Sequence, residues 1–169
     1  MCSHKPKAVG QGCIDKCPIT HEHFAGCSLG ECCVKDLVLI VEDDSCQAEV
    51  LVDLLIRCGL TARLLVLRNG EEVLAYLKGE APYADREHHP LPKVLLLDLI
   101  MKGIDGLEVL AWMQTQPQFK IRMYVLTSPM NLNQMTRAYE LGASSFLTKP
   151  FAEHELRSMV GQLNKILSS

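Results

Sequence analysis

The most constraining feature of this sequence is the regular alternation, from residue 36 onward, of short apolar runs with amphipathic stretches. Continuous apolar runs are typical of strands buried on both faces, and apolar residues spaced three and four apart are typical of helices. Strands are expected at 36–41, 62–67, 93–99, 121–126 and 144–148, and helices at 45–58, 71–78, 107–114, 131–141 and 152–167. This order predicts an α/β fold, a five-stranded parallel sheet with helices on both faces.

A change in composition near residue 35 divides the chain into a short Cys/His-rich N-terminal extension, 1–35, and a domain, 36–169. The extension lacks a hydrophobic period and contains six of the eight cysteines. Its candidate metal ligands are Cys13, Cys17, Cys27, Cys32 and Cys33, with His21 or His23. These residue types bind Zn²⁺ or iron–sulfur clusters, but the spacing matches no standard finger or ferredoxin run. A metal or redox site and a flexible, readily oxidised tail therefore remain alternative interpretations.

Charge and hydropathy exclude several classes of function. The formal net charge is −3 and the basic residues are scattered, so the sequence predicts no direct nucleic-acid partner. The apolar runs at 37–41 and 94–101 are too short to cross a bilayer, and residues 1–33 lack the apolar core of a signal peptide. We therefore expect no membrane partner and a cytoplasmic location.

Reactive side chains gather at the carboxyl ends of the expected strands, the edge at which doubly wound α/β sheets bind ligands. The strand-end residues are Glu42, Asp43 and Asp44 after the first strand, Asp98 in the third, Thr127 after the fourth and Lys149 after the fifth. If the first and third strands are neighbours, three carboxylates converge, and hard oxygen ligands of this kind suit Mg²⁺. The ion, the lysine and the hydroxyl group would then stabilise a phosphoryl group arriving at Asp98.

With these motifs the chain resembles the receiver domain of two-component response regulators, the CheY-like superfamily, over residues 36–167. The matching motifs are V-E-D-D at 41–44, L-L-L-D at 95–98, D-G at 105–106, V-L-T-S at 125–128 and T-K-P at 148–150. Each motif alone is weak, but all five stand in the family's order at strand ends or in the following turn. The resemblance implies a stand-alone regulator with a flavodoxin-like sheet of strand order 2-1-3-4-5.

The resemblance also implies the roles of the strand-end residues. Asp98 would accept a phosphoryl group from a sensor histidine kinase or a phosphotransfer protein, and Lys149 would bind that group. Mg²⁺ would be held by Asp43, Asp98 and the main-chain carbonyl of Ile100, with Glu42 acting through water.

A switch pair, Thr127 and Phe146, is implied by the same resemblance, and would pass phosphorylation on to an unidentified downstream protein. The chain would then be no enzyme, apart from assisting its own phosphorylation and dephosphorylation. The rival hypothesis is a metal or redox sensor in which the Cys-rich extension senses and the receiver is a scaffold.

Several local features modify this expectation. Lys102 occupies a turn position where the family usually has Pro, which alters loop rigidity. Ile100 is apolar where many relatives are polar, which predicts slow self-dephosphorylation. The extended loop at 83–92 resembles small single-domain regulators, including those paired with phytochrome-type kinases, and its His88-His89 pair is expected to be solvated. A cis Lys149–Pro150 peptide is also expected.

Overall fold

The computed structural model describes residues 36–128 and 132–168, so the expected Cys-rich extension lies outside the described residues. The described chain forms an all-parallel sheet of order β2-β1-β3-β4-β5, which confirms the expected topology. The strands are β1 (Leu37–Val41), β2 (Arg63–Leu67), β3 (Val94–Asp98), β4 (Arg122–Thr127) and β5 (Ser145–Thr148). The helices are α1 (Ser45–Arg57), α2 (Gly70–Lys78), α3 (Gly106–Gln114), α4 (Leu132–Glu140) and α5 (Glu153–Leu167).

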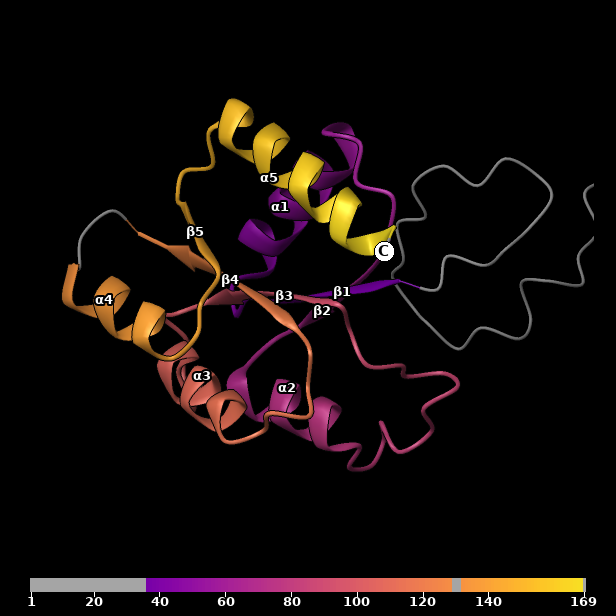
Figure 1. The fold of residues 1–169 in the computed structure, drawn as a ribbon. Helices are drawn as coiled ribbons and strands as arrows, with labels where there is room; N and C mark the ends of the chain where they lie inside the picture. The colour runs from indigo at the N-terminus through magenta and orange to yellow at the C-terminus, as the bar shows by residue number, and fades with distance from the viewer. Residues whose placement is uncertain (1–35, 129–131, 169) are drawn as a thin grey trace, which may run out of the picture.

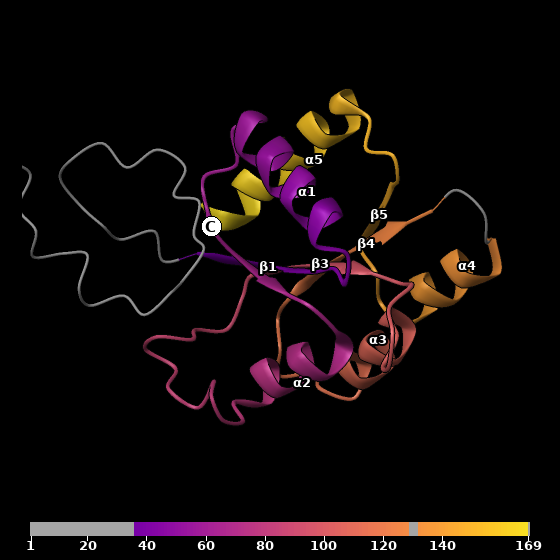
Figure 2. The same cartoon turned by 180° about the vertical axis from the view of Figure 1, so that it is seen from behind.

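Helices cover both faces of the sheet (Figures 1 and 2). Helices α1 and α5 lie on one face, and α2, α3 and α4 lie on the other. Alternate residues of β1 belong to separate hydrophobic cores: Leu39 packs on the α2–α4 side and Ile40 on the α1–α5 side. Strands β1 and β3 are buried along their whole length, which explains their continuous apolar sequence. Among the described helices, none is long and apolar enough to span a membrane.

Capping side chains place the helices directly behind the strand ends. Asp44 accepts hydrogen bonds from the first turn of α1, and Asn69 does the same for α2. Asp105 and Glu108 form a reciprocal capping box at the start of α3. Helices α2 and α3 consequently begin one residue earlier than their apolar spacing predicts, at Gly70 and Gly106 in place of residues 71 and 107.

The long connection between α2 and β3 folds back on α2. The ring of His89 packs edge-on against Tyr76 and Tyr83, with ring centroids 5.9 and 5.3 Å apart. The expectation that the histidine pair is solvated is therefore correct for exposed His88 and wrong for half-buried His89. Two tyrosine rings provide an apolar surface for His89. This packing could not be predicted, because the sequence of the loop has no hydrophobic periodicity.

The register of the sheet brings distant strand ends together. Val41 pairs with Leu97, so Glu42 and Asp98 follow side by side at the carboxyl edge of β1 and β3. Strand β1 lies between β2 and β3, which makes this edge the point where the strand order reverses. Such a switch point leaves a crevice between the loops that follow the two strands.

Candidate functional site

An open pocket of about 330 Å³ lies at this switch point. Its walls come from the loops that follow β1 and β3, from Ser128 after β4 and from the connection after β5. The charged residues that line it are the acids Glu42, Asp43, Asp44 and Asp98 and the bases Lys102 and Lys149. Acids outnumber bases in the pocket, which gives it a negative charge.

Three of these carboxylates form a tight cluster. Glu42, Asp43 and Asp98 place oxygen atoms within 4.8 Å of one another. Glu42 is 1% exposed and Asp98 is 6% exposed, whereas Asp43 is half-buried. The structure thus brings together the three acids that the sequence places at two separate strand ends. Carboxylates this close repel one another unless a positive charge joins them.

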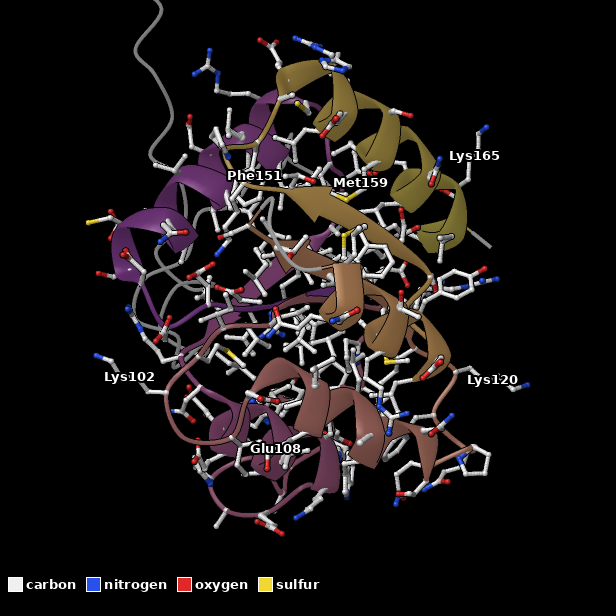
Figure 3. All side chains as sticks on the ribbon, turned by 90° about the vertical axis from the view of Figure 1, so that its left-hand side faces the viewer. Lys102, Glu108, Lys120, Phe151, Met159 and Lys165 are labelled. Carbon is white, nitrogen blue, oxygen red and sulfur yellow. The ribbon has the colours of Figure 1, made fainter. Side chains whose placement is uncertain are left out.

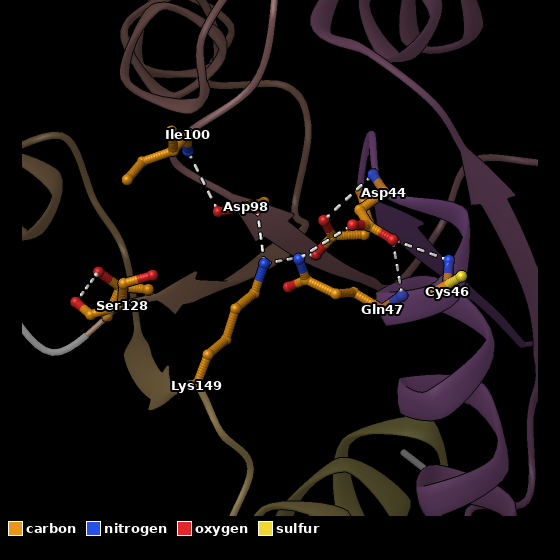
Figure 4. A network of polar contacts seen from close by, with 9 residues as sticks. Asp44, Cys46, Gln47, Asp98, Ile100, Ser128 and Lys149 are labelled. Carbon is orange, nitrogen blue, oxygen red and sulfur yellow. Dashed lines mark hydrogen bonds and ion pairs between the residues drawn. The ribbon is translucent and has the colours of Figure 1, made fainter.

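Lys149 supplies a positive charge to the cluster (Figure 4). Its Nζ lies 2.6 Å from Oε2 of Glu42 and 2.6 Å from Oδ2 of Asp98. The Lys149–Pro150 peptide after β5 is cis, as expected. Burial lowers the pKa of Lys149, but its hydrogen bonds with Asp98 and Glu42 outweigh this effect and raise the pKa above its ordinary value. Lys149 is therefore an ammonium ion at neutral pH.

Burial has a strong effect on the ionisation of Glu42. Burial raises the pKa of Glu42, the hydrogen bond from Lys149 lowers it, and the neighbouring Asp98 raises it again. The net pKa lies above the ordinary value. Loss of the lysine charge would make the ionised form of Glu42 still less favourable.

The backbone after β3 closes around Asp98. The N–H of Ile100 donates to Oδ1 of Asp98 at 3.1 Å (Figure 4). A Cβ atom at Gly106 would collide with the main-chain oxygen of Asp98, so only glycine lets α3 begin this close to the strand. The Ile100 side chain is 59% exposed and lines the pocket. Asp98 is consequently held by its own loop as well as by Lys149.

The expected switch pair lies on the two neighbouring strands at the edge of the sheet. Thr127 ends β4, is 3% exposed, and its hydroxyl donates to the carbonyl of Ser128 at 3.1 Å. Phe146 on β5 is half-buried and packs against the core on the α2–α4 side. In this structure the Thr127 hydroxyl is engaged with its own loop and makes no hydrogen bond to Asp98 or Lys149.

Sequence reasoning did not identify Gln47 as a pocket residue. Its Nε2 donates to Oδ2 of Asp44 at 3.4 Å, and its backbone N–H donates to Oδ1 at 3.1 Å. The hydrogen bonds from Gln47, with a smaller one from Cys46, hold the pKa of Asp44 below its usual value. Asp44 therefore acts as the cap of α1. The sequence offered one indication of this role: residue 47 lies in the first turn of a helix that follows the strand-end acids directly.

The chemistry of the pocket fits a hard divalent cation. Its clustered donors are all carboxylate oxygens, which Mg²⁺ and Mn²⁺ prefer over nitrogen or sulfur ligands. In the part of the chain that the structure describes, this is the one group of at least three potential metal ligands. The residues present are thus suited to the cation that the sequence predicts.

A five-stranded parallel sheet of this order, with an acidic pocket and a partly buried lysine at its switch point, is typical of the CheY-like class of α/β signalling domains. The model of the response regulator receiver domain family matches residues 38–161 of this chain. The chain belongs to that family, whose members act in two-component signal transduction.

Two relatives illustrate the similarity. Response regulator Rcp1 of Synechocystis sp. is 33% identical over 125 residues, which cover 73% of this chain and 83% of that protein. The probable methanogenesis regulatory protein FilR2 of Methanothrix harundinacea is 30% identical over 130 residues, covering 76% and 81%.

Solved structures show the same architecture. The Mn²⁺-bound form of Rcp1 is 32% identical, with a TM-score of 0.64 over 76% of this chain and 91% of that one. The phosphorylated cyanobacterial phytochrome response regulator RcpA is 27% identical, with a TM-score of 0.65 over 79% and 94%. These likenesses identify the chain as a two-component response regulator. They give no support to the rival hypothesis of a metal or redox sensor.

Proposed function

We propose that Asp98 is the phosphoacceptor of this response regulator. The observation that supports it best is the position of Lys149, whose ammonium group joins Asp98 to Glu42 at 2.6 Å each. A carboxylate that is nearly buried, paired with a lysine and beside a second acidic group supports the proposal, because phosphoryl transfer depends on such charge stabilisation. Asp43 and Glu42 complete the acidic cluster.

In the proposed reaction a carboxylate oxygen of Asp98 forms a bond to the phosphorus of the donor. The bond from phosphorus to the donor's nitrogen or oxygen breaks, and its electron pair leaves with the donor. Lys149 is placed to move its hydrogen bond from the carboxylate to a phosphoryl oxygen. A Mg²⁺ ion held by Asp43, Asp98 and the main-chain carbonyl of Ile100, with Glu42 acting through water, would neutralise charge on the phosphoryl group. The protein would thereby assist its own phosphorylation. In dephosphorylation a water oxygen would form the new bond to phosphorus, the bond from phosphorus to the Asp98 oxygen would break with its electron pair returning to the carboxylate, and inorganic phosphate would leave.

The proposed donor is a sensor histidine kinase or a phosphotransfer protein. RcpA is a phytochrome response regulator, and so is the bacteriophytochrome response regulator RtBRR, 32% identical with a TM-score of 0.68 over 76% of this chain and 77% of that one. Their similarity favours a kinase of the phytochrome type as the partner, at a cytoplasmic location.

The proposed output is contact with a downstream protein rather than with nucleic acid. The Thr127 hydroxyl would break its hydrogen bond to the carbonyl of Ser128 and turn toward the phosphoryl group. Phe146, on the neighbouring strand, would then repack. This rearrangement would change the face formed by α4, β5 and α5.

Labelling with a small phosphoryl donor tests the proposed acceptor. Wild-type protein with Mg²⁺ and acetyl phosphate or phosphoramidate should gain one phosphoryl group, and Asp98→Asn should gain none. Asn keeps the size of the side chain, so circular dichroism should show that the variant folds like the wild type. Equal labelling of both proteins would refute the assignment.

A further inference from the structure

Lys102 is the second basic residue of the pocket and differs from Lys149 in its surroundings. The Lys149 side chain is 13% exposed and is shared by two carboxylates. Lys102 is exposed and, within the residues that the structure describes, forms no hydrogen bond or ion pair. Its ammonium charge is therefore not neutralised by a neighbouring side chain.

The loop around Lys102 is held on both sides. Met101 is buried at 9% exposure, and Gly103 has a left-handed backbone with φ of 76°. A Cβ atom at Gly103 would collide with the carboxylate of Glu71, which also accepts a hydrogen bond from the N–H of Ile104 at 3.1 Å. The backbone of Lys102 is thus fixed at the edge of the pocket although its side chain is free.

Lys102 lines the same pocket as Asp98, so its charge bears on ions that enter this pocket. The pocket is lined by four carboxylates and by two lysines, one of which is shared between Glu42 and Asp98. A positive charge at the edge of an acidic pocket attracts approaching anions and repels approaching cations. Anionic phosphoryl donors and divalent cations both have to enter here.

We propose that Lys102 attracts the anionic phosphoryl donor to the pocket and, by the same charge, weakens the binding of the divalent cation. The inference rests on the proposed function of Asp98. The family usually has Pro at this position. A lysine here would favour entry of the anionic donor over binding of the cation. A lysine whose charge does not reach the pocket would affect neither the entry of the donor nor the binding of the cation.

The test compares three variants with wild type. Lys102→Gln removes the charge, Lys102→Arg keeps it, and Lys120→Gln removes an exposed lysine from the connection between α3 and β4. Figure 3 shows Lys102 and Lys120 on opposite sides of the molecule, which makes Lys120 a matched control. The dissociation constant for Mn²⁺ is measured by electron paramagnetic resonance without any phosphoryl donor. The initial rate of labelling is measured at saturating Mg²⁺ and low acetyl phosphate.

Lys102→Gln should bind Mn²⁺ about two- to fivefold more tightly and accept phosphoryl groups about two- to fivefold more slowly. Both differences should shrink when the ionic strength rises from about 0.05 M to about 0.5 M, because salt screens exposed charges. Lys102→Arg and Lys120→Gln should match wild type in both measurements.

Any other pattern overturns the inference, including changes of the same sign in both measurements or an unchanged Mn²⁺ affinity. If wild type takes no label at all, the proposed role of Asp98 fails. The Mn²⁺ measurement alone then decides the inference, and an unchanged affinity in Lys102→Gln overturns it.

Discussion

Lys149 neutralises part of the negative charge of the pocket, so replacing it by Gln should lower the free energy of unfolding. The change leaves Glu42 and Asp98 facing each other without the ammonium group between them. In metal-free buffer the free energy of unfolding should fall by about 1–3 kcal/mol, since removing one partner of a buried pair exposes the others to repulsion. Added Mg²⁺ should recover part of this loss. Urea unfolding with and without chelator measures both effects, and an equal loss in Lys120→Gln would contradict the account.

We expect the apolar side chain of Ile100 to slow the loss of the phosphoryl group. Its side chain lines the pocket two residues after Asp98 and offers water no hydrogen-bonding group. We expect Ile100→Asn to shorten the half-life of the phosphorylated protein several-fold, because the amide can orient an attacking water. Decay of label after removal of the donor measures this, and an unchanged or longer half-life would count against it.

The sequence could predict that the strand-end acids and Lys149 share one pocket, but not which contacts they make there. Asp98 and Lys149 stand out because charged groups at the ends of apolar strands demand partners. Asp44 also follows a strand, yet only the structure shows that its carboxylate caps α1. The packing of His89 escaped prediction because it depends on a loop that folds back on α2.

At the scale of elements, the connection between α2 and β3 is fastened by Arg86. Its guanidinium donates to the carbonyls of Tyr76 and Leu77 in the last turn of α2, at 2.8 Å each, and to that of His89 at 3.2 Å. Arg86→Ala should lower the free energy of unfolding by about 1–3 kcal/mol, because half-buried carbonyls lose charged donors. Arg57→Ala, which removes an exposed pair with Asp53, should change it by less than about 0.5 kcal/mol.

Thermal or urea unfolding of the two arginine variants decides the question, and equal losses would mean that Arg86 does not fasten the connection. Phosphoryl labelling of Arg86→Ala serves as a second measurement. It should persist, because the connection lies outside the acidic pocket.

Periodicity predicted every strand and helix of the described domain, and capping chemistry explains why two helices start one residue earlier than predicted. The helix after β3 starts at Gly106 because Asp105 caps it, and the helix after β2 starts at Gly70 because Asn69 does. The strand order came from the family resemblance, since apolar runs alone do not specify which strands pair. The fold of the long connection between α2 and β3 could not be predicted, because its tyrosine and histidine rings pack without the periodicity of a helix or a strand.

At the scale of the whole molecule, the two hydrophobic cores of the described residues extend from Leu37 to Leu167. Lys93 bonds to the carboxylate of Asp36 at 3.0 Å and to the carbonyl of Leu167 at 3.0 Å, which ties the start of the domain to its last helix. A fragment of residues 36–169 should therefore fold and accept phosphoryl groups at a rate within about twofold of the full chain. Loss of folding or labelling would show that residues 1–35 are required.

Mapping the modified residue tests directly whether Asp98 is the phosphoacceptor. Wild-type protein labelled with Mg²⁺ and acetyl phosphate is reduced with borohydride, which converts an acyl phosphate to a stable alcohol, and is then digested for mass spectrometry. We expect one modified side chain, Asp98, and none in Asp98→Asn. Modification of Asp43 or Glu42 in place of Asp98, or no modification of wild type, would contradict it.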